Sequence, residues 1–129
     1  GMRFAEYLET ANEQVAVLVQ AEHIEAVDNI ESIVRVEGID GIMLGPYDLS
    51  ASLGKMGQLD DPAVVGAIER IFQTCQSTGM PIGYFGVSAD AVRPYLQKGY
   101  NLILAGVDTL HLGNAARELL NELKPSPND

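Results

Sequence analysis

Gln20 and Glu22 stand two positions apart at the end of an apolar run, in the stretch VLVQAE. Residues two apart on a strand point to the same side, so these polar side chains would leave a buried strand together. Asp48 follows the next apolar run, in LGPYDLS. Neighbouring parallel strands lie about 4.8 Å apart, so Glu22 and Asp48 could converge. Two close carboxylates repel each other, and a hard divalent cation would relieve that repulsion.

The cation that suits such a carboxylate pair is Mg²⁺ or Mn²⁺, and water and substrate oxygens would complete its ligands. The alternative is that each acid only caps the helix that follows it, and spacing alone favours this alternative. In LGPYDLS, Gly45 allows close backbone approach and Pro46 restricts the turn. The backbone N–H groups of Tyr47 and Asp48 could then face a small carboxylate, although the string is also compatible with a plain turn.

The remaining polar residues are weaker candidates for a catalytic or metal-binding role. His23 and His111 lack the spacing of metal ligands and are interpreted as surface or helix-end residues. Cys75 falls on the apolar face of a predicted helix and is expected in the core. There is no phosphate-loop or dinucleotide-binding pattern and no visible catalytic triad. Nucleotide binding and serine or cysteine nucleophiles therefore have no support in the sequence.

Composition narrows the classes of function further. The 129 residues include 18 acidic and 8 basic ones, a net charge of −10. This balance argues against nucleic acid and against anionic membrane surfaces as partners. No apolar run is long enough to span a bilayer. The single cysteine cannot form an internal disulfide, which fits a cytoplasmic location.

Strand-like and helix-like segments alternate along the chain, which we interpret as one partial domain over residues 1–129. The strands are predicted at 15–20, 41–44, 81–86 and 101–106. The helices are predicted at 3–14, 23–36, 62–78, 88–99 and 108–123, with a loop at 45–61 and a frayed tail at 124–129. We expect the first strand to be buried on both faces. Asp61, Ser88 and Gly79 are the expected caps, and Pro94 should remove one helical hydrogen bond.

A short helix followed by four βα units predicts an α/β fold with a parallel sheet. Two architectures compete, a doubly wound sheet and half of a TIM (β/α)₈ barrel, since eight units typically need about 250 residues. A response-type domain is a third, lower-ranked interpretation, which the long 45–61 loop does not suit. A half barrel would expose an apolar concave face and two strand edges, so it should associate with another half.

Three strings, VLVQAE, VEGIDGIMLGPYDLSASLG and GYNLILAGVDT, together resemble the HpcH/HpaI aldolases, the class II 2-keto-3-deoxy-acid aldolases. The resemblance runs in order along nearly the whole chain and implies the C-terminal half of a TIM barrel. It implies Glu22 and Asp48 as ligands of a divalent metal (Mg²⁺, Mn²⁺ or Co²⁺), and Gln20, Tyr47 and Asp48 as substrate-binding residues. Tyr47 would act through its backbone N–H, at a position that is usually small in the family.

The resemblance implies reversible cleavage of 4-hydroxy-2-oxo acids to pyruvate and an aldehyde, with the metal acting as a Lewis acid. The family's catalytic histidine and arginine come from the first half of the barrel, and no motif here matches either. We therefore predict no catalytic residue in this chain and weak or absent activity of the isolated chain. The family also favours a homo-oligomer. The alternative function is a non-catalytic oligomeric half barrel that binds metal or pyruvate-like anions, or serves only in assembly.

Overall fold

The computed structural model describes residues 4–124 of the chain. The strands are β1 (Leu18–Ala21), β2 (Gly41–Leu44), β3 (Ile82–Gly86) and β4 (Leu102–Ala105). The helices are α1 (Phe4–Gln14), α2 (Ile24–Asp28), α3 (Ile30–Ile33), α4 (Pro46–Ser52), α5 (Pro62–Thr78), α6 (Ala89–Lys98) and α7 (Asp108–Leu123). Most of the tail predicted to fray, together with the first three residues, lies outside the described residues.

The four strands form one parallel sheet in the order β1-β2-β3-β4. Each strand is therefore hydrogen-bonded to the strand that precedes or follows it in the chain. A doubly wound sheet reverses its strand order at a switch point, where its ligand binds, whereas a (β/α)₈ barrel keeps the sequential order. The observed order confirms half of a barrel and excludes both the doubly wound sheet and the response-type domain.

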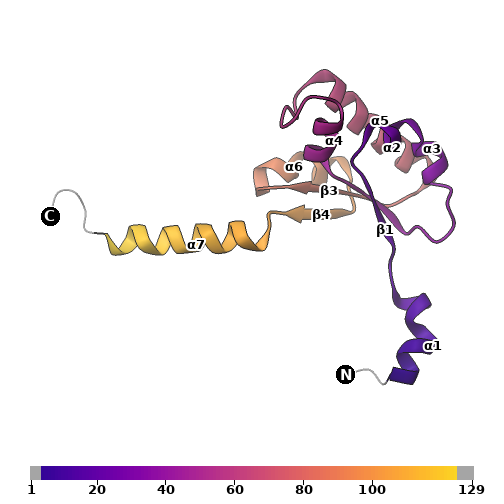
Figure 1. Cartoon of the computed structure of the whole chain (residues 1–129), viewed down its shortest axis with the longest axis horizontal. Coiled ribbons are helices and arrows are strands. Elements are labelled where there is room, and N and C mark those ends of the chain that lie inside the picture. The colour runs from indigo at the N-terminus through magenta and orange to yellow at the C-terminus, as the bar shows by residue number, and fades with distance from the viewer. Residues whose placement is uncertain (1–3, 125–129) are drawn as a thin grey trace.

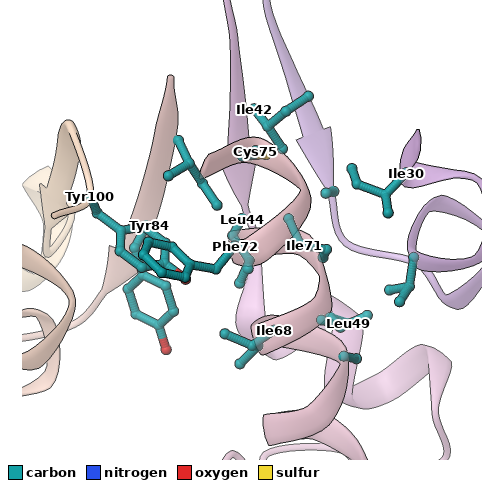
Figure 2. Close-up of a cluster of buried hydrophobic side chains, with 14 of the residues drawn as sticks. Ile30, Ile42, Leu44, Leu49, Ile68, Ile71, Phe72, Cys75, Tyr84 and Tyr100 are labelled. Atoms are coloured by element: carbon teal, nitrogen blue, oxygen red, sulfur yellow. The ribbon is translucent and has the colours of Figure 1, made fainter. Parts of the chain in front are cut away.

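Helices α2 to α6 gather on one side of the sheet (Figure 1), and the hydrophobic core consists of side chains from these helices and from the strands. Helix α5 supplies the largest share of the helical side of this core, and its side chains meet those of β2 and β3 (Figure 2). Phe72 of α5 stacks on Tyr100, with ring centroids 5.0 Å apart. Cys75 is fully buried as predicted, and burial raises the pKa of its thiol to about 11.

Local sequence signals explain where the longer helices begin and end. The Asp61 carboxylate accepts a hydrogen bond from the Ala63 N–H at the start of α5. This bond, with further help from Lys55, lowers the pKa of the Asp61 carboxyl. Ser88 caps α6 in the same way, and Gly79 ends α5 in the left-handed conformation that glycine adopts without strain. All three predicted caps are confirmed, and Pro94 lies inside α6 as expected.

Three sequence-based predictions of local structure are wrong in part. Residues 45–61 are not all loop, because Pro46 begins the helix α4. The predicted helix 23–36 is two short helices that meet at Asn29, whose side-chain amide donates to the Glu25 carbonyl and competes with helix continuation. The first strand begins at Leu18 rather than at Val15. It is an edge strand with one open face, so it is not buried on both sides.

The first and last helices project from the body of the sheet (Figure 1). Neither α1 nor α7 contributes a buried residue. Both carry large apolar side chains that remain exposed, and on α7 these include Leu112, Leu119, Leu120 and Leu123. Such unpartnered apolar surface is uncommon on a monomeric protein. Within residues 4–124, no helix combines the length and apolar character needed to cross a membrane.

The buried hydroxyl of Tyr100 leads us to predict a stabilising substitution in the core. The Tyr100 hydroxyl is buried and, among the described residues, lacks a hydrogen-bond partner. An unsatisfied buried polar group costs about 1–3 kcal/mol, so we expect Tyr100→Phe to raise the free energy of unfolding by about 1 kcal/mol. Urea titration measures this change. Tyr7→Phe on the exposed α1 is the control and should have little effect, and a net loss of stability in Tyr100→Phe would contradict the prediction.

Candidate functional site

Gln20 and Glu22 leave the C-terminal end of β1 on the same side, as the two-residue spacing predicts. The Gln20 Nε2 atom donates a hydrogen bond to Oε2 of Glu22 at 2.9 Å. This bond holds the half-buried Glu22 carboxylate beside the next strand, where Ala21 of β1 pairs with Leu44 of β2. The pair is therefore a positioned carboxylate supported by a neighbouring amide.

Gly45 provides the surface against which Glu22 lies. A Cβ atom added at Gly45 would be 2.7 Å from Glu22 Oε2 and 3.0 Å from Glu22 Cβ. A residue with a Cβ atom at this position would force the Glu22 carboxylate to move. The glycine of LGPYDLS is thus explained by close approach of the Glu22 side chain, and not by an unusual backbone conformation, since its φ is −100°.

Asp48 and Tyr47 lie in the first turn of α4, directly after β2. Gly45 is the N-cap of α4 and His23 is the N-cap of α2. Neither Asp48 nor Glu22 is therefore the N-cap of the helix that follows it, although Asp48 lies in the first turn of α4, where the helix dipole favours an acidic side chain. The first N–H groups of a helix have no intrahelical partner, so those of Tyr47 and Asp48 remain available to an anion.

Two serines fix the position of α4, and sequence reasoning did not assign them this role. Ser50 is fully buried, donates to the Tyr47 carbonyl at 2.6 Å and accepts from the Gly57 N–H at 3.0 Å. Ser52 accepts from the Ile24 N–H at 3.1 Å and so connects α4 to the helix that follows β1. These bonds anchor the turn that carries Tyr47 and Asp48.

A hollow of about 250 Å³ lies at the C-terminal ends of the strands. Its lining includes Gln20, Gly45, Tyr47, Asp48 and Phe85. The structure therefore brings three of the four predicted site residues to one place, whereas Glu22 does not line the hollow and is hydrogen-bonded to Gln20, which does. Phe85 of β3 was not predicted. Its ring meets the Tyr47 ring edge to face, with centroids 6.3 Å apart. The alternation of side chains along a strand could have identified it, because Phe85 points opposite to the core residue Tyr84.

The donor set fits a hard divalent cation. Glu22 and Asp48 offer carboxylate oxygens, and within residues 4–124 no cluster of three or more histidine, cysteine or acidic side chains forms a complete protein cage. Mg²⁺ commonly uses only one or two carboxylates and takes further oxygens from water and substrate. The glycine cradle that holds the Glu22 carboxylate is the structural feature that favours such a role. Convergence of the two carboxylates on one ion stays a prediction.

Both histidines have structural roles, as the sequence predicts. His23 Nδ1 accepts from the Glu25 N–H at 3.3 Å and caps α2. His111 Nε2 lies 3.0 Å from the Ala105 carbonyl oxygen, at the start of α7.

The close approach at Gly45 gives a test of the site that leaves both carboxylates in place. Gly45→Ala should displace the Glu22 side chain, because the new Cβ overlaps its carboxylate. We expect affinity for Mn²⁺ to fall about tenfold, in the range found when support of a ligand is lost. Calorimetric titration measures the affinity. Gly66→Ala in α5, where an added Cβ meets nothing within 4 Å, is the matched control. Unchanged Mn²⁺ affinity in Gly45→Ala would contradict this reading of the glycine.

Comparison with known proteins identifies the family. The family model described as HpcH/HpaI aldolase/citrate lyase matches residues 2–115. A hydroxypyruvate/pyruvate aldolase of Cupriavidus necator is 39% identical over 124 residues, which are 96% of this chain and 46% of that protein. A 4-hydroxy-2-oxo-heptane-1,7-dioate aldolase of Escherichia coli is 39% identical over 117 residues, covering 91% of this chain and 45% of that protein.

Comparison with solved structures points to the same family as the sequence comparison. A crystal structure of an HpcH/HpaI aldolase/citrate lyase family protein from Burkholderia cenocepacia superimposes with a TM-score of 0.85 at 39% identity, over 92% of this chain and 46% of that one. The fold is that of a TIM-barrel aldolase, of which this chain spans about half the length. The chain belongs to the HpcH/HpaI aldolase/citrate lyase family.

Proposed function

We propose that this chain carries the metal- and pyruvate-binding part of a divalent-metal-dependent aldolase, a carbon–carbon lyase. The reaction is cleavage of a 4-hydroxy-2-oxo acid into pyruvate and an aldehyde, as the names of the aldolase relatives suggest. The observation that carries the proposal is the Glu22 carboxylate, held by Gln20 and packed on Gly45, at the same sheet edge as Asp48.

The residues divide into two roles. Glu22 and Asp48 would hold Mg²⁺, Mn²⁺ or Co²⁺. Gln20, which lines the hollow and donates a hydrogen bond to Glu22, would contact the substrate. The bound cation would supply Lewis-acid chemistry toward the oxygen atoms of a 2-oxo acid. The backbone N–H groups of Tyr47 and Asp48 would hold the carboxylate of that acid. We assign no catalytic base to this chain, so the isolated chain is expected to be a weak or inactive enzyme.

Assembly and location complete the proposal. The unpartnered apolar surfaces of the sheet and of α7 support a homo-oligomer. They equally support the second candidate function, a non-catalytic oligomeric half barrel that binds anions or serves in assembly only. The acidic charge and the single, buried cysteine support a cytoplasmic location, with no role for nucleic acid or membranes.

The test is a calorimetric titration with Mn²⁺, followed by oxalate, a dianion with the shape of the pyruvate enolate. We expect Mn²⁺ to bind, and oxalate to bind only when Mn²⁺ is present. Equal oxalate binding with and without the metal, or the absence of Mn²⁺ binding, would reject the metal-dependent site. Binding of both ligands without turnover of 4-hydroxy-2-oxo acids would favour the non-catalytic alternative.

A further inference from the structure

A second, larger pocket adjoins the candidate site. It has a volume of about 440 Å³, and its lining comes from β3, α6, α4 and the segment that follows α4. Tyr47 and Phe85 line both this pocket and the smaller hollow beside Asp48. The two cavities therefore meet at this pair of aromatic rings, and one ligand can occupy both. The larger pocket has the size of cavities that bind small molecules.

Aromatic rings are concentrated around the larger pocket. The chain has five tyrosines, three phenylalanines and no tryptophan, and four of these residues line this pocket, namely Tyr47, Tyr84, Phe85 and Tyr95. Tyr95 of α6 stacks on Tyr84 of β3, with ring centroids 3.4 Å apart, and Tyr47 meets Phe85 edge to face. Because aromatic side chains interact favourably with further rings, the pocket suits a planar, apolar group.

The charges around the pocket select among such groups. Asp60 is the one acidic residue in the lining, and no arginine, lysine or histidine of the described residues lines the pocket. Lys55, the basic residue nearest to Asp60 in the sequence, forms an ion pair with Asp61 at 3.1 Å. A carboxylate on the ligand would therefore meet repulsion from Asp60 without a compensating positive charge. An uncharged ligand avoids this cost.

We propose that this pocket holds the group on C4 of the 4-hydroxy-2-oxo acid, and that this group is aromatic and uncharged. The aldehyde released is then an aromatic aldehyde. When the C3–C4 bond breaks, its electron pair stays on C3, which takes up a proton, while the 4-hydroxyl loses its proton and becomes the aldehyde carbonyl. The inference rests on the proposed function and names its substrate class. Glu22 and Asp48 do not line the pocket, so the pocket and the metal site can be tested separately.

An NMR titration with benzyl alcohol, an unreactive analogue of an aromatic aldehyde, tests the proposal on the intact, ¹⁵N-labelled chain. We expect saturable shifts of the amide signals of Gly57 and Gly86, which line the pocket. The matched probe is 4-(hydroxymethyl)benzoate, which adds one carboxylate to the same ring. It should bind about tenfold more weakly, because of the charge of Asp60, and Asp60→Asn should reduce this difference. Equal affinity of the parent chain for both probes would overturn the proposal.

A substitution that fills the pocket gives the second test. Ala91→Leu enlarges a lining side chain and should raise the dissociation constant for benzyl alcohol about tenfold, as overpacking of a filled site does. Ala89→Leu is the matched control, since Ala89 is on the same helix but outside the lining. We expect both variants to bind Mn²⁺ as the parent does.

The results separate this inference from the proposed function. Mn²⁺ binding without saturable shifts by benzyl alcohol in the parent chain, or undiminished benzyl alcohol binding in Ala91→Leu, would overturn the inference alone. Benzyl alcohol binding without Mn²⁺ binding would overturn the proposed function, and with it the assignment of the pocket to the C4 group. The shifts of the parent chain keep the test valid if Ala91→Leu misfolds.

Discussion

Replacing Glu22 by alanine should raise the dissociation constant of the chain for Mn²⁺ by about 100-fold or more. Glu22 is one of two carboxylates proposed to hold the ion, and Mg²⁺-type sites with few protein ligands depend on each of them. Loss of an outer partner of a ligand alone costs about 10–100-fold in affinity, so loss of the ligand itself should cost at least the upper value. Electron paramagnetic resonance of free Mn²⁺ measures the affinity directly.

The control for this experiment is Glu25→Ala, three residues further along on α2. Glu25 is exposed and carries the same charge, so it tests whether Mn²⁺ is attracted only by the net charge of −10. We expect Glu25→Ala to bind Mn²⁺ nearly as the parent does. Equal losses in the two variants would mean diffuse electrostatic attraction, and the site at the end of β1 would then be rejected.

Replacing Ile71 by alanine should lower the free energy of unfolding by about 3 kcal/mol. Ile71 is fully buried on α5 and belongs to the single core that joins this helix to the strands (Figure 2). Substitutions of this kind cost about 2–5 kcal/mol, through lost burial and the cavity left behind. This is a large part of the total stability of about 5–15 kcal/mol typical of a domain.

Urea unfolding at one fixed protein concentration measures this loss, since association would change the apparent stability. Val65→Ala is the matched control, because Val65 is on the same helix and 50% exposed. Its effect should stay within about 0.5 kcal/mol. A similar loss in both variants would show that α5 contributes to stability through its helical propensity more than through its buried face.

Much of the fold was predictable because its signals are local. Asp61 and Ser88 start helices and Gly79 ends one, and each does so through its own side chain or its own backbone freedom. The apolar runs at 41–44 and 81–86 nearly match β2 and β3. Two of the three errors arose where contacts distant in the sequence decide the structure. Helix α4 is held by serine hydrogen bonds to Gly57 and Ile24, and the exposure of β1 depends on its place at the edge of the sheet.

The candidate site divides in the same way. The two-residue period predicted that Gln20 and Glu22 leave β1 together, and their side chains are hydrogen-bonded. The reason for Gly45 could not be predicted, because it is the approach of a side chain from another strand. The position of Phe85 in the hollow was not predicted, because a phenylalanine in a strand is expected in the core unless it is known which residues of β3 point to each face of the sheet. Whether Glu22 and Asp48 share one cation stays a prediction for the Mn²⁺ titration.

The reaction of the buried Cys75 thiol with a disulfide reagent can report transient opening of the core. This thiol is the one sulfhydryl group in the sequence, it is fully enclosed, and its pKa of about 11 keeps it protonated at neutral pH. A disulfide reagent can therefore react only during moments when α5 separates from the sheet, and the rate of labelling counts those moments. A ligand or a second chain that stabilises the native state would lower the rate of Cys75 labelling, and no additional reporter group is needed.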